Sequence, residues 1–568
     1  MTTWIMWIMT SLLLGITAKR LTGRLSLGIV VQALSFTLLN VAANEPMTPD
    51  LLVTSMQALA IAICVFGLRR WPEHSLAALG AIVGALLLSK VNSGAFALIA
   101  VAYAAIVTLP RLRRIALLRW GSRAVVILMG PMLMYKDLGW SGRYALLGAA
   151  GGLALVLVAW ISGLHPDDEI HEDESSWWTI NLLRGLILAL VGILGAIFIL
   201  GTSPRALFET LIVDGSRQRL EDPMPAVLTG AVVWWAAVGV VCALLVSLQS
   251  ARLRLGGGIG SLTTDRQDTF AEGDRRSPSP IAAIARLLAG LAIWCSLVDA
   301  WPIGIAPNAA FALALPLAWV AAVPSGRDDG STAARFLRLL VPALAIMNAL
   351  FAYPVAGSQV WYASTLFVLC GAVCVADGLH DLQAYLSVST RANVAAAGRN
   401  VAIALTVVLA LIWTLDFVVR PIDTYRSVYR ADRALPFPGA TRLRLEAEET
   451  AVFTGLIADA KAHCRALISL PGLPSLNLWS GLPEPNGLSV IGVWWKALLP
   501  AQLATALESA EAAPGLCEIR DQKEVEAWSS NPLPRIGLVR FLQSDFVPIG
   551  RFGFQQLGYY ELMVRKDV

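Results

Sequence analysis

Charged residues are scarce in this chain. Only 15% of its 568 residues are Asp, Glu, Lys or Arg, whereas 56% are hydrophobic, and the mean hydropathy is +0.64. Soluble domains carry about 25% charged residues, so the composition excludes an ordinary soluble protein. Apolar runs of about 20 residues are long enough to cross a bilayer as helices, in which the backbone polar groups are satisfied internally. The composition therefore predicts a mainly α, polytopic helical membrane protein.

Motifs for cofactor chemistry are also missing. The seven cysteines form no Cys-x-x-Cys pair and no zinc-binding spacing, and five of them lie in apolar runs as small buried hydrophobes. The glycine run 256–258 opens no strand–loop–helix unit, so nothing indicates a nucleotide, a redox cofactor or a nucleic-acid partner. His165 and His171 flank an acidic loop, which is read as a solvated segment, with a metal site as the alternative.

The basic residues orient the apolar runs. Lys19, Arg20 and Arg24 follow the first run, the pair at 69–70 follows the third, and the densest basic loop spans 111–123. Loops rich in Lys and Arg stay in the cytoplasm, so the polar turns 44–50 and 90–94 are expected outside. About 14 spans are predicted by hydropathy, the last of them at about 401–419.

A change of composition near residue 420 divides the chain. Residues 1–420 are predicted to form the membrane domain, interrupted by a flexible cytoplasmic linker at 249–280 that is rich in Gly, Ser, Arg and Asp. Residues 421–568 are predicted to form a small extracytoplasmic α/β domain. Its expected helices are 446–464 and 502–512, and its expected strands are 466–470, 516–520 and 559–565.

Two cysteines lie in this polar domain rather than in apolar runs. Cys464 and Cys517 each stand beside a predicted strand. Disulfides form and persist outside the cytoplasm, so a bond between them is predicted, with two free buried thiols as the alternative.

Several stretches expected on the outer face resemble bacterial integral-membrane glycosyltransferases of the GT-C group, which includes protein O-mannosyltransferases and the aminoarabinose transferase. The tail resembles the periplasmic domain of glycosyltransferase family 39-like proteins. Nearly the whole chain is covered, but no single motif is diagnostic. The stretches are Asn-Glu-Pro at 44–46 with Asp-Leu-Leu at 50–52, and those at 88–94, 201–203, 352–359, 435–440, 470–475 and 478–481.

The resemblance implies sugar transfer from a polyprenyl-phosphate donor to a hydroxyl of a glycan, lipid or protein acceptor, among membrane lipids at the outer face of a bacterial cytoplasmic membrane. Asp50 or Glu45 matches the second acidic position of the group, and Lys90 matches the donor end of its cavity. The acidic motif of the first outer loop has no counterpart, so the first family helix and loop are expected to be lacking. A non-catalytic relative that binds lipid or glycan, or pairs with an active partner subunit, is the alternative. A transporter or flippase is less favoured, because paired broken helices in internal repeats are absent.

The chemistry of such a reaction sets the candidate residues. A carboxylate, Asp50 or Glu45, would accept the proton of the acceptor hydroxyl. Cationic or polar groups would stabilise the leaving phosphate, and a divalent cation is left open. The candidates for phosphate binding are Lys90, Asn92, Lys136, Arg143 and Arg205, and those for acceptor or sugar binding are Tyr353, Gln359, Trp361, Trp494 and Trp495.

Simpler roles compete with several of these assignments. Asp50 follows a proline and precedes an apolar run, so it could cap a helix. Lys90 could extend from a helix end toward the membrane surface. Tyr353 and Trp361 could belong to an interfacial aromatic belt.

Overall fold

The computed structural model describes the greater part of the chain. The described residues are 2–41, 48–161, 172–209, 213, 228, 230–259, 280–299, 308–328, 331–353, 359–388, 415, 419–470, 472–485, 487, 500–522, 537–554 and 558–566. The chain divides into two compact units, one of residues 1–202 and 224–414 and the other of residues 203–223 and 415–568.

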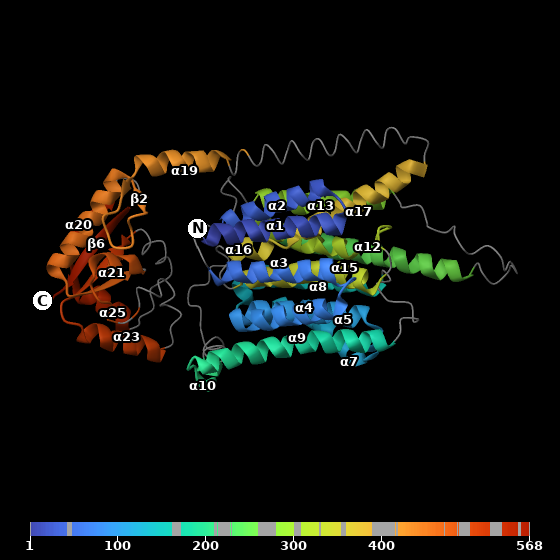
Figure 1. Cartoon of the computed structure of the whole chain (residues 1–568), viewed down its shortest axis with the longest axis horizontal. Coiled ribbons are helices and arrows are strands. Elements are labelled where there is room, and N and C mark those ends of the chain that lie inside the picture. Colours follow the sequence, from blue (N-terminus) through green and yellow to red (C-terminus); the bar gives the residue numbers. More distant parts are fainter. Residues whose placement is uncertain are drawn as a thin grey trace. The chain divides into compact units, whose positions relative to one another are not determined.

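The first unit is a bundle of helices that run side by side (Figure 1). Among the described residues, 11 helices are long and apolar enough to cross a membrane. These features are those of a multi-pass membrane protein. The helices are α1 (Thr2–Thr22), α2 (Leu25–Val41), α3 (Pro49–Gly67), α4 (Pro72–Ser89), α5 (Val91–Thr108), α6 (Pro110–Arg114), α7 (Ala116–Leu133), α8 (Leu138–Ile161), α9 (Glu172–Ile199), α12 (Ala231–Ile259), α13 (Pro280–Asp299), α14 (Asn308–Leu317), α15 (Thr332–Ala349), α16 (Gln359–Ser364) and α17 (Phe367–Val388), with 3₁₀ segments η4 (Ala318–Ala322) and η5 (Leu350–Ala352).

One of the predicted boundaries differs from the structure. Helix α12 continues to Ile259, so the first part of the predicted linker at 249–280 is helical rather than flexible. The predicted span at 401–419 lies almost entirely outside the described residues, and the number of 14 spans stays a prediction.

Glycine allows the closest helix contact in the bundle. Gly80 of α4 and Gly185 of α9 face each other's helix, and a Cβ atom at either position would collide with a backbone carbonyl of the other helix. Small residues at a helix interface let backbones approach closely, which is a main source of association energy between membrane helices. The pair therefore sets the α4–α9 spacing.

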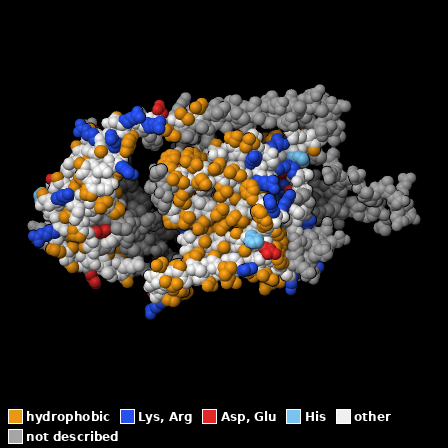
Figure 2. All heavy atoms as spheres, viewed as in Figure 1, with side chains coloured by type: hydrophobic (Ala, Val, Ile, Leu, Met, Phe, Trp, Pro, Cys, Tyr) orange, Lys and Arg blue, Asp and Glu red, His pale blue; other side chains and the backbone are white. Residues whose placement is uncertain are grey.

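Charge divides the bundle into two ends. The turns between α1 and α2, between α3 and α4, and after α5 are rich in basic residues, and we call this side the basic end. The turns before α3, between α4 and α5, and after α15 form the opposite side, which we call the Asp50 end. Figure 2 shows an apolar middle with Lys and Arg side chains gathered at one end of the helical unit. Such a belt is what hydrocarbon would surround.

The second unit contains a four-stranded sheet of order β3-β4-β6-β5, in which β3 and β4 are parallel and the other pairs are antiparallel. A separate hairpin joins β1 and β2. The bounds are α10 (Pro204–Phe208), α19 (Arg420–Ala431), β1 (Arg433–Ala434), β2 (Arg444–Leu445), α20 (Ala447–His463), β3 (Ala466–Leu470), α21 (Pro474–Ser480), α23 (Pro500–Ala512), β4 (Leu516–Asp521), α25 (Gly537–Ser544), β5 (Phe546–Phe554) and β6 (Gly558–Arg565).

Side-chain alternation along the strands builds a core on each face of this sheet. Ile468 of β3 packs with the apolar side chains of α23 and α25. Its neighbour Leu467 packs on the other face with α20 and α21, where Trp479 stacks on Phe437 at 5.3 Å between ring centroids. Successive residues of a strand point to opposite faces, so a run of apolar residues in β3 fits a sheet covered on both sides.

Cys464 and Cys517, the pair predicted from the sequence, are joined by a disulfide, with their Cα atoms 5.6 Å apart. The bond ties the end of α20 to β4. The predicted strands 466–470, 516–520 and 559–565 lie within one residue of β3, β4 and β6. Strand β5 and helices α21 and α25 were not predicted.

Candidate functional site

Asp50 and Lys90 meet at the Asp50 end, although 40 residues of chain separate them. Asp50 stands in the first turn of α3, and Lys90 occupies the single residue between α4 and α5 with an extended backbone. Lys90 Nζ donates to Asp50 Oδ1 at 2.7 Å, and the side chains are 26% and 7% exposed. A nearly buried carboxylate needs such a partner, because burying an unpaired charge is costly.

The geometry excludes the helix cap as the role of Asp50. Helix α3 begins at Pro49, so the cap position belongs to Thr48, and Asp50 already has helical backbone. A cap side chain must precede the helix to reach its first free N–H groups. The carboxylate of Asp50 instead pairs with Lys90.

Aromatic side chains of η5 and α16 contact Lys90 and the residue that precedes α3. The ammonium of Lys90 lies 4.0 Å from the ring centroid of Phe351, within reach of a cation–π contact. Thr48 donates from its hydroxyl to that of Tyr362 at 3.4 Å. The start of α3, the residue between α4 and α5, and the segment after α15 therefore meet at this site.

A second carboxylate, Asp137, lies at the same end and was not among the residues predicted. It stands in the turn between α7 and α8 and accepts a hydrogen bond from the Tyr353 hydroxyl. Burial, and then the neighbouring Asp137, raise the pKa of Tyr353, so the hydroxyl stays a donor. Tyr353 is two residues beyond Phe351, so the segment 351–353 contacts both Lys90 and Asp137.

The predicted acceptor-binding residues are only partly accessible. Trp361 is 9% exposed and packs in the bundle core, and Gln359 is half-buried at the start of α16. Tyr353 is half-buried and engaged with Asp137. Little of the Trp361 ring can therefore stack on a sugar. Trp494 and Trp495 lie outside the described residues, and so does Glu45.

The other predicted phosphate-binding residues make contacts of their own. Arg143 donates to the carbonyl of Leu228 at 2.6 Å. Lys136 is exposed, 5.6 Å from the Tyr135 ring centroid. The Asn92 side-chain oxygen accepts from the adjacent backbone N–H, and Arg205 pairs with Glu209 at 2.8 Å on exposed α10. Of this set, Lys90 is the one that the structure pairs with the proposed base.

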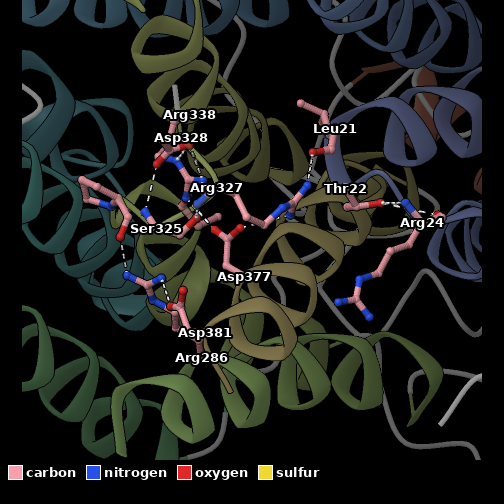
Figure 3. Close-up of polar contacts among 12 residues, drawn as sticks. Leu21, Thr22, Arg24, Arg286, Ser325, Arg327, Asp328, Arg338, Asp377 and Asp381 are labelled. Atoms are coloured by element: carbon pink, nitrogen blue, oxygen red, sulfur yellow. Dashed lines mark hydrogen bonds and ion pairs between the residues drawn. The ribbon is translucent and has the colours of Figure 1, made fainter. Parts of the chain in front are cut away.

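A network of buried ion pairs at the basic end was also not predicted (Figure 3). Arg338 of α15 pairs with Asp377 of α17 at 2.6 Å and with Asp328 at 2.7 Å. Arg327 pairs with Asp377 at 3.2 Å. Buried arginines need this many partners, because each carboxylate satisfies only part of the guanidinium.

A related pair extends the network along α17. Arg286 of α13 binds Asp381 at 2.6 Å. Asp377 and Asp381 are four residues apart in an apolar stretch and so share one helix face. The sequence signal was Asp377 near the end of an apolar run, because charges inside a span rarely face lipid.

No metal centre is found among the residues that the structure describes, where no three His, Cys, Asp or Glu side chains gather. Asp50 is paired with Lys90 rather than with a second carboxylate. The alternative metal site at His165 and His171 lies outside the described ranges.

Comparisons with family models, curated proteins and solved structures find no match to this chain. The site must therefore be interpreted from its own geometry.

Proposed function

We propose that this chain is a membrane glycosyltransferase-like protein that transfers a sugar from a polyprenyl-phosphate donor to an acceptor hydroxyl. The observation that carries the proposal is the Asp50–Lys90 pair, which places a nearly buried carboxylate beside a cation at one end of an apolar helix bundle. The reaction needs these two groups. Because the basic turns lie at the other end of the bundle, the positive-inside rule assigns the Asp50 end to the outer face of the membrane.

The ion pair suggests how donor binding would prepare the base. In the absence of donor, Lys90 holds an oxygen of Asp50 in an ion pair at 2.7 Å, which keeps that oxygen from the acceptor hydroxyl. A donor phosphate would compete for the ammonium of Lys90, whose side chain is 26% exposed. Asp50 would then be free to accept a proton.

The bond changes follow in one displacement. The acceptor oxygen attacks the anomeric carbon and forms the new glycosidic bond, while Asp50 takes its proton. The bond between the anomeric carbon and the phosphate oxygen breaks, and the electron pair leaves with polyprenyl phosphate. Lys90 stabilises the negative charge that grows on this phosphate.

A non-catalytic relative that binds lipid or glycan is the second candidate. The observation that favours it is again the ion pair, since a carboxylate with a lysine partner is satisfied as a structural element and needs no substrate. Catalysis requires Lys90 to leave Asp50 for the donor phosphate, whereas a non-catalytic relative keeps the ion pair intact.

A transfer assay separates them. Full-length protein in membranes is given a labelled polyprenyl-phosphate sugar, and transfer by the natural chain is compared with transfer by Asp50→Asn and by Glu73→Gln. Glu73 is a matched control, because it is an exposed acidic residue in the first turn of α4.

Loss of a general base costs about 100-fold to 10,000-fold in rate, so Asp50→Asn should reduce transfer by that factor while Glu73→Gln stays within about twofold. Equal nonzero transfer by Asp50→Asn would remove Asp50 as the base. Absence of transfer from the natural chain with several donor sugars would favour the non-catalytic relative.

A further inference from the structure

The ion-pair network at the basic end borders a cavity with more cations than anions. The cavity has a volume of about 250 Å³ and lies among the ends of α1, α3, α15 and α17 and the segment after η4. Its charged lining consists of four arginines and two aspartates: Arg20, Arg69, Arg327, Arg338, Asp328 and Asp377. The walls therefore carry an excess of two positive charges.

The two aspartates are already engaged. Asp377 accepts from both Arg327 and Arg338, and Asp328 accepts two bonds from Arg338. These contacts fix the guanidinium groups of two arginines in place (Figure 3). A cation would meet the excess positive charge and occupied carboxylates, so the cavity is suited to an anion.

The other two arginines of the lining add positive charge at the solvent-exposed side of the cavity. Arg20 near the end of α1 and Arg69 after α3 are both exposed side chains that line the cavity. Their guanidinium groups can fork onto the oxygens of a phosphate. The apolar part of the lining includes Leu21, Val65, Leu337, Val341 and Val373.

We propose that this cavity is a binding site for a phosphate group, held by Arg20 and Arg69 against the fixed Arg327–Arg338 cluster. The volume suits a single headgroup, because pockets for drug-sized ligands begin at about 300 Å³. Basic pockets between membrane helices are typical sites for phosphate-bearing lipid headgroups. The phosphate comes from a lipid or from a soluble phosphate, and the two sources are distinguished by experiment. The site is at the opposite end of the bundle from Asp50 and does not depend on transferase activity.

Native mass spectrometry of the full chain in detergent tests the site. The protein is titrated with dioleoyl phosphatidic acid, with dioleoylglycerol as the lipid that lacks a phosphate, and in a second arm with inorganic phosphate. The test variant is Arg20→Gln/Arg69→Gln, and Arg70→Gln is the control. Arg70 neighbours Arg69 but contacts the Trp71 ring and does not line the cavity.

Phosphatidic acid should bind the natural chain and Arg70→Gln alike, while affinity for Arg20→Gln/Arg69→Gln falls at least about tenfold, since each lost charge-assisted bond is substantial. Dioleoylglycerol should not bind at this site. If only inorganic phosphate binds with the same dependence on Arg20 and Arg69, the source is a soluble phosphate.

Affinity that is unchanged in Arg20→Gln/Arg69→Gln for both phosphate probes would overturn the site. The charge-conserving variant Arg20→Lys/Arg69→Lys guards against loss of fold and should regain part of the binding, because it keeps the charge but not the fork of the guanidinium. If Arg20→Lys/Arg69→Lys remains folded by size-exclusion chromatography and binds no better than the glutamine variant, the proposal also fails.

Discussion

The Asp50–Lys90 pair should show strong energetic coupling. Replacing Lys90 by Met leaves the carboxylate of Asp50, whose side chain is 7% exposed, without its cationic partner. Removing one partner of a buried pair costs about 3–5 kcal/mol of unfolding free energy, because the remaining charge has neither water nor a partner. Lys90→Met should therefore be among the most destabilising substitutions at this end of the bundle.

The converse change should cost less. In Asp50→Asn the Lys90 side chain, which is 26% exposed, keeps its ammonium close to the Phe351 ring, so water and the ring replace part of the lost bond. Loss of a hydrogen bond to a charged group costs about 1.5–3 kcal/mol. The expected order is a larger cost for the lysine substitution than for the aspartate substitution.

A double-mutant cycle measures the coupling directly. Unfolding of the natural chain, Asp50→Asn, Lys90→Met and the double variant is followed in detergent micelles by titration with sodium dodecyl sulfate. The double variant should be more stable than the sum of the two single costs predicts, by about 1–3 kcal/mol. Costs that add to within about 0.5 kcal/mol would refute the inference that the pair is a buried ion pair.

Three further predictions concern packing and the second unit. In the same titration, Gly185→Ala should lower the unfolding free energy of the bundle by at least about 2 kcal/mol through overpacking. The control Gly192→Ala should be nearly neutral, because a Cβ atom at that position of the same helix meets open space. Equal effects of the two substitutions would contradict the close contact. The Cys464–Cys517 disulfide closes a loop of 53 residues, so its reduction should lower the unfolding free energy of the second unit by about 4 kcal/mol. The loss is measured as faster hydrogen exchange in β3 and β4, and unchanged exchange would refute it. Burial raises the pKa of Glu518, so at pH values between its unfolded and folded pKa the folded unit binds more protons than the unfolded chain. The stability that comes from protonated Glu518 is therefore lost as the pH rises through the folded pKa. Glu518→Gln should remove that part of the pH dependence of hydrogen exchange in β4, and an identical profile in the variant would count against it.

The pattern of local residues accounts for much of the secondary structure. Apolar runs predict helices because a chain in hydrocarbon must satisfy its backbone within the segment. The short apolar run 466–470 between turn residues predicted β3 with its observed bounds. Strand β5 was missed, because Pro548 and two glycines in 546–554 weaken its strand pattern.

The candidate site was predictable in its parts but not in its arrangement. Asp50 and Lys90 could each be chosen from sequence as charges beside predicted spans. Their 2.7 Å contact joins α3 to the turn between α4 and α5, and Asp137 reaches Tyr353 across 216 residues. Sequence periodicity reports which face of a helix is apolar, not which distant helix packs on it.

The sequence by itself determined that this chain belongs in a membrane, because too few charged residues are available to cover a soluble fold. It also determined which end of the bundle is basic, since the arginines are clustered in alternate turns. Only the tertiary structure decided that Asp377 serves Arg327 and Arg338 together and that these residues border an arginine-lined cavity. The physical reason is that a buried charge takes its stability from partners on other helices, and their positions depend on packing along the whole chain.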